Sequence, residues 1–225
     1  MLRRRSIRTT SRGLAVPKPA DGPASTSRNT QLANRSLKAQ ELLTLGHGTA
    51  TADELVQLIR EAAIESIFDV RSVPKSRRHP QFWREEMERW IPEQSGSAYQ
   101  WEPALGGFRK VNRKSPNIAL RHPSFRAYAD YMQTEAFSRA LAVLLARAAV
   151  ARVAILCSET LWWRCHRRLI ADAAVMLHSV EVQHLMHDGK VRPHIPTAGV
   201  RVTAGGTLRY DLLFETDNVM LDPFD

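Results

Sequence analysis

The sequence predicts an α/β fold: a single three-layer domain with a mainly parallel sheet of about five strands, plus a small C-terminal hairpin. Short apolar runs typical of buried strands alternate along the chain with segments in which apolar residues recur at helical spacing. This alternation is typical of βαβ units, whose helices cover both faces of a parallel, Rossmann-like sheet. Because 44% of the residues are apolar, the chain can build a core of this kind.

The expected elements follow one another in a regular order. Strands are expected at residues 42–45, 66–72, 98–101, 153–156 and 180–186. Helices are expected from a capping box at Thr51 and Glu54 to Ala62, at 82–91, 124–132 and 135–149, and from about Cys165 to Leu177. The Asp188-Gly189 pair is a strong hairpin signal, so the last strand is expected to return through residues 191–194. A second small hairpin is expected at 200–210, turning at Gly205 and Gly206.

The two ends of the chain differ in charge from the domain between them. Residues 1–40 hold nine Lys or Arg residues and one acidic residue, which is +8 of the chain's net charge of +9. We expect a disordered basic leader at 1–40, an α/β domain at 41–213 and an acidic tail at 214–225. A nucleic-acid-binding arm and an organelle transit peptide are alternative interpretations of the leader.

The compartment is predicted from the cysteine content and from the absence of membrane signals. The two cysteines, Cys157 and Cys165, do not make a secreted disulfide framework, so we expect reduced thiols. The sequence has no apolar run of about 18 residues, and its start lacks the apolar core of a signal peptide. We therefore expect a cytoplasmic protein without a membrane partner. The oligomeric state does not follow from the sequence.

Chemistry is expected where the strand at 153–156 ends, because ligands of open parallel sheets bind beyond the carboxyl ends of strands. The polar residues that follow this strand are Cys157, Glu159, Cys165, His166 and Arg167. A helix start beside basic side chains would lower the pKa of the Cys165 thiol and make it a nucleophile. His166 need not be its base, because neighbours on a helix point about 100° apart. Packing in the core is the alternative role of both cysteines.

A second polar strand end is expected nearby. Asp69 and Arg71 are two residues apart, so they point to the same side if their strand is regular. Because carboxyl ends of parallel strands share one edge of a sheet, we expect this pair beside residues 157–159. The alternative is an ion pair that only holds the following loop. In that loop, Arg77 and Arg78 either bind an anion or form ordinary solvated surface.

The candidate residues divide into two roles. Those expected to act in catalysis are Cys165, Glu159, Asp69 and His47, which lies in a glycine turn at 46–48. Those expected to bind the substrate are Arg71, Arg77, Arg78, Cys157, His166, Arg167 and His194. A phosphate or similar oxyanion is expected between the turn amides and the guanidinium groups of Arg71 and Arg167. We assign no metal ligands and no cofactor from the sequence.

The polar motifs of the chain also occur in a fixed order. They are Thr44-Leu-Gly-His47, Asp69-Val-Arg71, Pro74 with Ser76-Arg77-Arg78 and Pro80-Gln-Phe82, Leu105-Gly-Gly107, Tyr128-Ala-Asp-Tyr-Met132, Cys157-Ser-Glu159, Cys165-His-Arg167 and Pro193-His194. Together they resemble a bacterial family called domain of unknown function 488, over roughly residues 44–212. Gly48 departs from the pattern, where the family would have serine. The resemblance implies a compact α/β domain with a polar cleft in which the motif residues share one site, and it implies no reaction.

Three classes of function fit these observations, and the sequence does not decide whether the chain is an enzyme. The first class is an enzyme acting on a nucleotide, a nucleic-acid fragment or another phosphorylated substrate. The second is a nucleic-acid-binding module without catalysis, whose affinity would fall steeply with salt and survive the loss of both cysteines. The third is a metal-binding protein that uses Cys157, Cys165 and a histidine, although Cys-x7-Cys-His is not a familiar zinc spacing.

Overall fold

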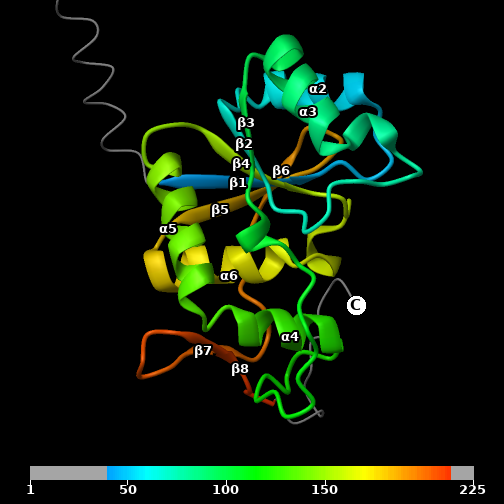
Figure 1. The fold of residues 1–225 in the computed structure, drawn as a ribbon. Helices are drawn as coiled ribbons and strands as arrows, with labels where there is room; N and C mark the ends of the chain where they lie inside the picture. Colours follow the sequence, from blue (N-terminus) through cyan, green and yellow to red (C-terminus); the bar gives the residue numbers. More distant parts are fainter. Residues whose placement is uncertain (1–39, 214–225) are drawn as a thin grey trace, which may run out of the picture. The chain divides into compact units, whose positions relative to one another are not determined.

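The structure, a computed structural model, describes residues 40–213 (Figure 1). The basic leader and the acidic tail predicted for residues 1–40 and 214–225 lie outside these described residues, except for Gln40. Within residues 40–213, no helix combines the length and the apolar character needed to cross a membrane.

Six strands form the main sheet, in the order β3-β2-β4-β1-β5-β6. They are β1 (Glu41–Gly46), β2 (Ser66–Asp69), β3 (Ala98–Trp101), β4 (Val153–Cys157), β5 (Glu181–Leu185) and β6 (Val191–Pro193). All neighbours pair in parallel except β5 and β6, which are antiparallel. The prediction of a mainly parallel α/β sheet is confirmed. The sixth strand is the return strand that the Asp188-Gly189 turn predicts.

Helices cover both faces of this sheet (Figure 1). One face carries α2 (Ala52–Glu61) and α3 (Arg84–Trp90), and the other carries α4 (Pro123–Tyr131), α5 (Glu135–Ala148) and α6 (Arg167–His178). Side chains of β4 alternate between the two cores, so that Ile155 and Cys157 face α4–α6 whereas Ala154 and Leu156 face α2 and α3. This alternation directs the Cys157 side chain to the α6 side of the sheet.

Two helices show how local sequence sets their ends. The side chain of Thr51 accepts a hydrogen bond from the backbone N–H of Glu54, and the Glu54 carboxylate accepts one from the N–H of Thr51, which completes the predicted capping box at the start of α2. The helix predicted at 82–91 is preceded by a 3-10 turn, η1 (Pro80–Phe82), and continues as a π-helical turn, η2 (Ile91–Ser95). Pro92 has no N–H, so it cannot donate the hydrogen bond that a further α-helical turn requires.

The remaining elements are short. The predicted second hairpin is formed by β7 (Val200–Val202) and β8 (Leu208–Tyr210), which pair antiparallel. Two further 3-10 turns, η3 (Pro103–Leu105) and η4 (Trp162–Arg164), lie after β3 and after β4. Both turns lead into residues of the candidate site.

The carboxyl ends of three neighbouring strands meet at one edge of the sheet. Gly46 of β1 pairs with Cys157 of β4, and Asp69 of β2 pairs with Leu156 of β4. The prediction that Asp69 and Arg71 lie beside residues 157–159 is therefore confirmed.

Candidate functional site

Cys157, Cys165 and His166 form a buried cluster at the end of β4. The Nδ1 atom of His166 lies 3.6 Å from the Sγ of Cys165 and 3.9 Å from the Sγ of Cys157. One potential ligand atom from each residue lies within 4.8 Å of the other two. The exposed fractions of the three residues are 5%, 2% and 9%, so the cluster is almost completely shielded from solvent.

The path of the chain after β4 brings these three residues together. Cys157 is the last residue of β4, and the chain then turns through η4, where the N–H of Cys165 donates to the carbonyl oxygen of Trp162. Cys165 has extended backbone angles and His166 is the N-cap of α6, so the two are not successive residues of one helix. The argument that they point about 100° apart therefore does not apply, and both side chains turn towards Cys157.

One hydrogen bond fixes the orientation of the His166 ring. Its Nε2 atom lies 3.0 Å from the carbonyl oxygen of Val70. A carbonyl oxygen only accepts hydrogen bonds, so Nε2 carries the hydrogen. In the neutral ring, the lone pair of Nδ1 is then directed towards the two sulfur atoms. The edge-on ring of Tyr128, 5.1 Å away between centroids, supports the imidazole from another side.

The two thiols differ in acidity. Burial raises the pKa of the Cys165 thiol, but a hydrogen bond from Cys157 and the positive charge of Arg167 outweigh it and lower the pKa to about 6. The Nε of Arg167 donates to the Sγ of Cys165 at 3.3 Å. The hydrogen bond to Cys165, together with burial, raises the pKa of the Cys157 thiol. Cys165 is therefore the thiol that ionises first.

Two glycines allow close packing of the backbone, one beside the cluster and one beside the neighbouring residue Glu159. A Cβ atom on Gly107 would lie 2.7 Å from the Nδ1 of His166, and a Cβ atom on Gly46 would lie 1.8 Å from the carbonyl oxygen of Glu159. Any larger residue at either position would displace the groups it meets. The Leu-Gly-Gly motif thus belongs to the cluster because its second glycine leaves space beside the imidazole nitrogen.

Asp69 and Arg71 form a second buried group beside the cluster. The Asp69 carboxylate accepts hydrogen bonds from the Nε and NH2 groups of Arg71 and, at 2.6 Å, from the hydroxyl of Tyr99. The same guanidinium donates to the carbonyl oxygen of Phe82 and to the Sδ of Met87. The arrangement matches the alternative interpretation of this pair, an ion pair that holds the loop after β2.

His47 packs against this ion pair. Its ring stacks on Phe82 at 4.3 Å between centroids, and its Nε2 lies 3.4 Å from the NH1 of Arg71. Burial and the charge of Arg71 lower the pKa of His47 to about 4. His47 is therefore neutral at physiological pH and adjoins the cluster without contacting its sulfur atoms.

The donors expected to bind an oxyanion already have partners within the protein. The N–H groups of His47 and Gly48 donate to the carbonyl oxygens of Cys157 and Ser158, at 3.0 and 2.9 Å. The NH2 group of Arg167 donates to the carbonyl oxygen of Glu159. An oxyanion at this point would have to displace those partners, so the geometry gives the predicted anion site no support there.

Three other candidate residues lie apart from the cluster. The side chains of Arg77 and Arg78 are exposed on the loop after β2, and that of Glu159 is exposed beyond β4. Glu159 contributes its backbone carbonyl to the site, as the acceptor for Arg167. A catalytic carboxylate at Glu159 and substrate binding by the two arginines remain predictions.

Comparison with known families identifies the domain. The family model described as a domain of unknown function, DUF488, matches residues 51–174, which is more than half of the chain. The chain belongs to the DUF488 family. Neither the curated proteins nor the solved structures yielded a match. The DUF488 match includes all three residues of the Cys157, Cys165 and His166 cluster, whereas Thr44–His47 and His194 lie outside the matched residues.

A buried hydrogen-bonded chain lies behind this DUF488 cluster. His194 binds the Asp172 carboxylate through Nε2 at 2.9 Å and His184 through Nδ1 at 3.0 Å, and His184 binds the hydroxyl of Thr44 at 2.7 Å. We call these four residues the histidine chain. His194 was expected at the substrate site, but its side chain contacts Asp172, His184 and the ring of Trp162.

Sequence reasoning missed two of the four members of the histidine chain, His184 and Asp172. The hairpin contained a signal that His184 and His194 lie close together. With a turn at Asp188-Gly189, His184 pairs with Arg192. His194 is two residues after Arg192, so its side chain points to the same face of the sheet as that of His184. Asp172 gave no such signal, because it lies inside an ordinary helical pattern. The ring of Trp162, stacked on His184 at 3.9 Å, was also missed.

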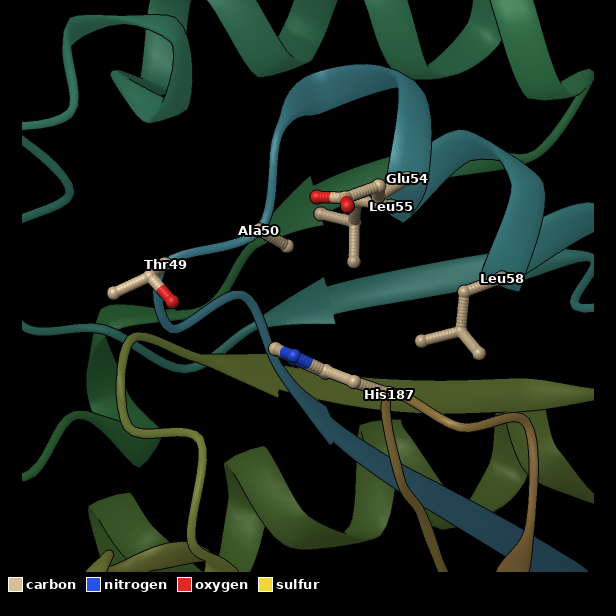
Figure 2. A pocket seen from close by; sticks show the side chains of 6 residues that line it. All are labelled: Thr49, Ala50, Glu54, Leu55, Leu58 and His187. Carbon is tan, nitrogen blue, oxygen red and sulfur yellow. The ribbon is translucent and has the colours of Figure 1, made fainter.

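A pocket of about 240 Å³ opens on the other face of the sheet (Figure 2). Its lining consists of Thr49, Ala50, Glu54, Leu55, Leu58 and His187. His187 donates from Nε2 to the carbonyl oxygen of Gly46 at 2.6 Å, which holds the imidazole at the pocket wall. The pocket therefore adjoins the turn after β1 on the α2 side of the sheet, whereas Cys157 faces α6.

Proposed function

We propose that this DUF488 domain is an enzyme whose reaction centre is a zinc-class metal ion held by Cys157, Cys165 and His166. The observation that carries the proposal is the convergence of the three buried ligand atoms. A tetrahedral zinc ion with ordinary bond lengths separates a sulfur and a nitrogen ligand by about 3.5 Å. The observed separations of 3.6 and 3.9 Å are close to this value, so an ion would need little rearrangement of the side chains.

The groups around the three ligands support the same proposal. Histidine ligands in metal sites usually donate their second ring nitrogen to a carbonyl or carboxylate, which fixes the tautomer that binds the ion. His166 makes this bond to Val70. The hydrogen bond from Arg167 to the Sγ of Cys165 would offset part of the thiolate charge and orient the sulfur.

The number of ligands favours catalysis over a purely structural role. Among the described residues, the group contains three potential ligands and not four. Structural zinc sites are almost always closed by four protein ligands, whereas catalytic sites keep one position for water or substrate. A metal ion there would polarise a phosphoryl or carbonyl oxygen, or lower the pKa of a bound water to about 7. Hydrolysis or transfer at a phosphorylated substrate fits this chemistry.

A reducing compartment such as the cytoplasm is part of the proposal. Metal binding requires both cysteines as thiolates, and an oxidised pair could not bind the ion. Both cysteines are free thiols in the structure. Disulfides are rare in the cytosol, where thiols are kept reduced.

A metal-free thiol enzyme is the second candidate. It is favoured by the contact between Arg167 and Cys165, which stabilises a thiolate nucleophile. The two candidates make different predictions for His166: a metal centre needs its Nδ1 as a ligand, whereas the pairing of Cys165 with Arg167 does not involve it.

The test is the metal content of the purified protein after incubation with Zn²⁺ and dialysis. We expect one equivalent of zinc in the parent and almost none in the C157S, C165S and H166Q variants. H178Q is the matched control, because His178 is an exposed histidine at the other end of α6. Cobalt substitution should give the absorption of a thiolate-bound tetrahedral ion. A parent without zinc, or an H166Q variant that retains it, would exclude the metal centre and leave the thiol enzyme.

A further inference from the structure

We propose that the loops at residues 73–79 and 108–114 form a binding surface for single-stranded nucleic acid, the substrate class of the metal centre. The claim that the nucleic acid is the substrate rests on the proposed function. The claim that the surface binds nucleic acid rests on separate observations and has its own measurement.

Positive charge is concentrated in the two chain segments that contain these loops. Residues 41–225 hold 23 Lys or Arg and 22 acidic residues, so that part of the chain is nearly neutral. Eleven of the 23 basic residues fall within residues 70–84 and 103–129, which contain no Asp or Glu. The exposed members within the two loops are Lys75, Arg77, Arg78, Lys110, Arg113 and Lys114. A local excess of this kind attracts a polyanion.

Exposed apolar side chains lie among these cations. Phe108 is 80% exposed, Val73 is 65% exposed and Val111 is 50% exposed. An aromatic ring so open to water gains little for the stability of the fold. Single-stranded nucleic acids bind to surfaces that combine cations for the backbone with aromatic rings on which bases stack. The combination therefore favours a nucleic acid over an acidic peptide, which has no bases to stack on Phe108.

The two loops are joined next to the cluster. The N–H of Phe108 donates to the Oγ of Ser72 at 2.8 Å, which ties the start of one loop to the start of the other. The residue before Phe108 is Gly107, where an added Cβ atom would meet the imidazole of His166. A strand bound across Phe108 would therefore lie one residue along the chain from the glycine beside His166.

The second loop is held firmly at its base. The guanidinium of Arg109 lies 3.7 Å from the ring centroid of Tyr131 and donates to the carbonyl oxygen of Ala104 at 2.9 Å. The hydroxyl of Tyr131 donates to the same carbonyl at 2.7 Å. Phe108 is thus presented to solvent from an ordered base, which lowers the entropy cost of binding.

The test measures fluorescence anisotropy of a short labelled oligothymidylate with the full-length protein, at several salt concentrations between about 50 and 200 mM. The variants are F108A and the double variant R77A/R78A. The control is R139A/R147A, which removes the same charge from the exposed side of α5 and leaves the basic leader unchanged. This design separates the surface from any binding by residues 1–40.

We expect F108A to weaken binding at least fivefold with an unchanged salt dependence, because Phe108 no longer stacks on a base. R77A/R78A should weaken binding and reduce the slope of log affinity against log salt by roughly 0.7 for each phosphate group that the variant no longer neutralises. R139A/R147A should bind like the parent. The proposal is overturned if F108A binds as tightly as the parent, if R77A/R78A matches R139A/R147A, or if a polyglutamate peptide binds this surface and the oligonucleotide does not.

The failure of this inference is distinguishable from the failure of the metal centre. Zinc content is measured on the same preparations, and F108A should retain one equivalent because Phe108 is not a ligand. A parent that binds zinc but no oligonucleotide would leave the metal centre standing and remove the surface. A parent that binds the oligonucleotide through Phe108 but holds no zinc would keep the surface and remove its link to the metal.

Discussion

His166 and His194 are both buried beside α6, yet their ring nitrogens have different surroundings. Both nitrogens of His194 are bound by polar groups that belong to the histidine chain, Nδ1 to His184 and Nε2 to Asp172. One nitrogen of His166 donates to the carbonyl oxygen of Val70, and the other faces two sulfur atoms. A thiol is a weak hydrogen-bond donor, so this second nitrogen gains little from its neighbours.

The difference separates a network whose polar groups are all paired from the cluster at which we propose a ligand. The histidine chain ends in a strong hydrogen-bond partner on each side. At one end is the hydroxyl of Thr44. At the other end is the Asp172 carboxylate, which also accepts hydrogen bonds from the N–H of Thr197 and the hydroxyl of Tyr210. Buried polar groups satisfied in this way stabilise the fold and specify the core. The cluster at the end of β4 instead brings three potential ligand atoms within 4.8 Å of one another, an arrangement that would suit the metal ion we propose.

The largest expected effect comes from breaking the histidine chain. Asp172 is fully buried and accepts three hydrogen bonds, from His194, Thr197 and Tyr210, so the D172A variant leaves three buried donors without an acceptor. We expect a loss of about 3–5 kcal/mol in the free energy of unfolding, measured with urea. The folded fraction of D172A should retain zinc. If D172A keeps the stability of the parent but loses the metal, the roles assigned to the two networks are reversed.

The pH dependence of stability tests whether the fold holds His184 as a neutral imidazole. Burial and the charges of His194 and Arg167 lower the pKa of His184 to about 2, against about 6.5 in the unfolded chain. Well above pH 6.5 neither state is protonated at His184, so this residue contributes no pH dependence there. Below pH 6.5 only the unfolded chain takes up the proton, and stability falls by at most about 1.4 kcal/mol per pH unit.

Urea unfolding at several pH values between about 7.5 and 5 checks this expectation. The H184Q variant is the comparison, because it keeps the other titrating groups and removes only this one. Its stability should fall less steeply with falling pH than that of the parent. Equal slopes in the two proteins would show that His184 titrates alike in the native and unfolded states.

The smallest expected effect concerns the space beside His166. In the G107A variant, the new Cβ would meet Nδ1 at 2.7 Å, so the imidazole must shift from the position in which Nδ1 faces the sulfur atoms. We expect about a tenfold loss of zinc affinity with a change in stability of about 1 kcal/mol. G205A is the control, because a Cβ there meets nothing closer than the Oγ1 of Thr203 at 3.8 Å. Unchanged zinc affinity in G107A would show that the ring position is not critical.

The fold could be predicted from the sequence because its signals are local. Alternating apolar periods located the strands and helices, and the Asp188-Gly189 turn located the return strand. The edge shared by Asp69 and Cys157 followed from the rule that parallel strands end together. These inferences needed only the backbone direction and the side-chain period, both of which the sequence carries.

The cluster could not be predicted in the same way, because it depends on how a loop folds. The spacing Cys-x7-Cys-His matches no familiar zinc motif, and the sequence suggested that Cys165 and His166 lie on one helix. The 3-10 turn η4 and the extended conformation of Cys165 bring the three residues together, and neither has a strong sequence signal. The expectation that Arg71 binds an oxyanion gained no support for a related reason. The sequence shows the charge of Arg71, but it does not show the groups within the protein to which its N–H groups already donate.

Pro193 lies in β6, the strand that ends the sheet on one side. The N–H of His194 donates inward to the carbonyl oxygen of Val182, and N–H groups of an edge strand alternate between inward and outward. Pro193 therefore occupies an outward position, where it offers no hydrogen to a further strand. A strand from another molecule would lack one hydrogen bond at this edge of the sheet, so Pro193 disfavours edge-to-edge aggregation through β6.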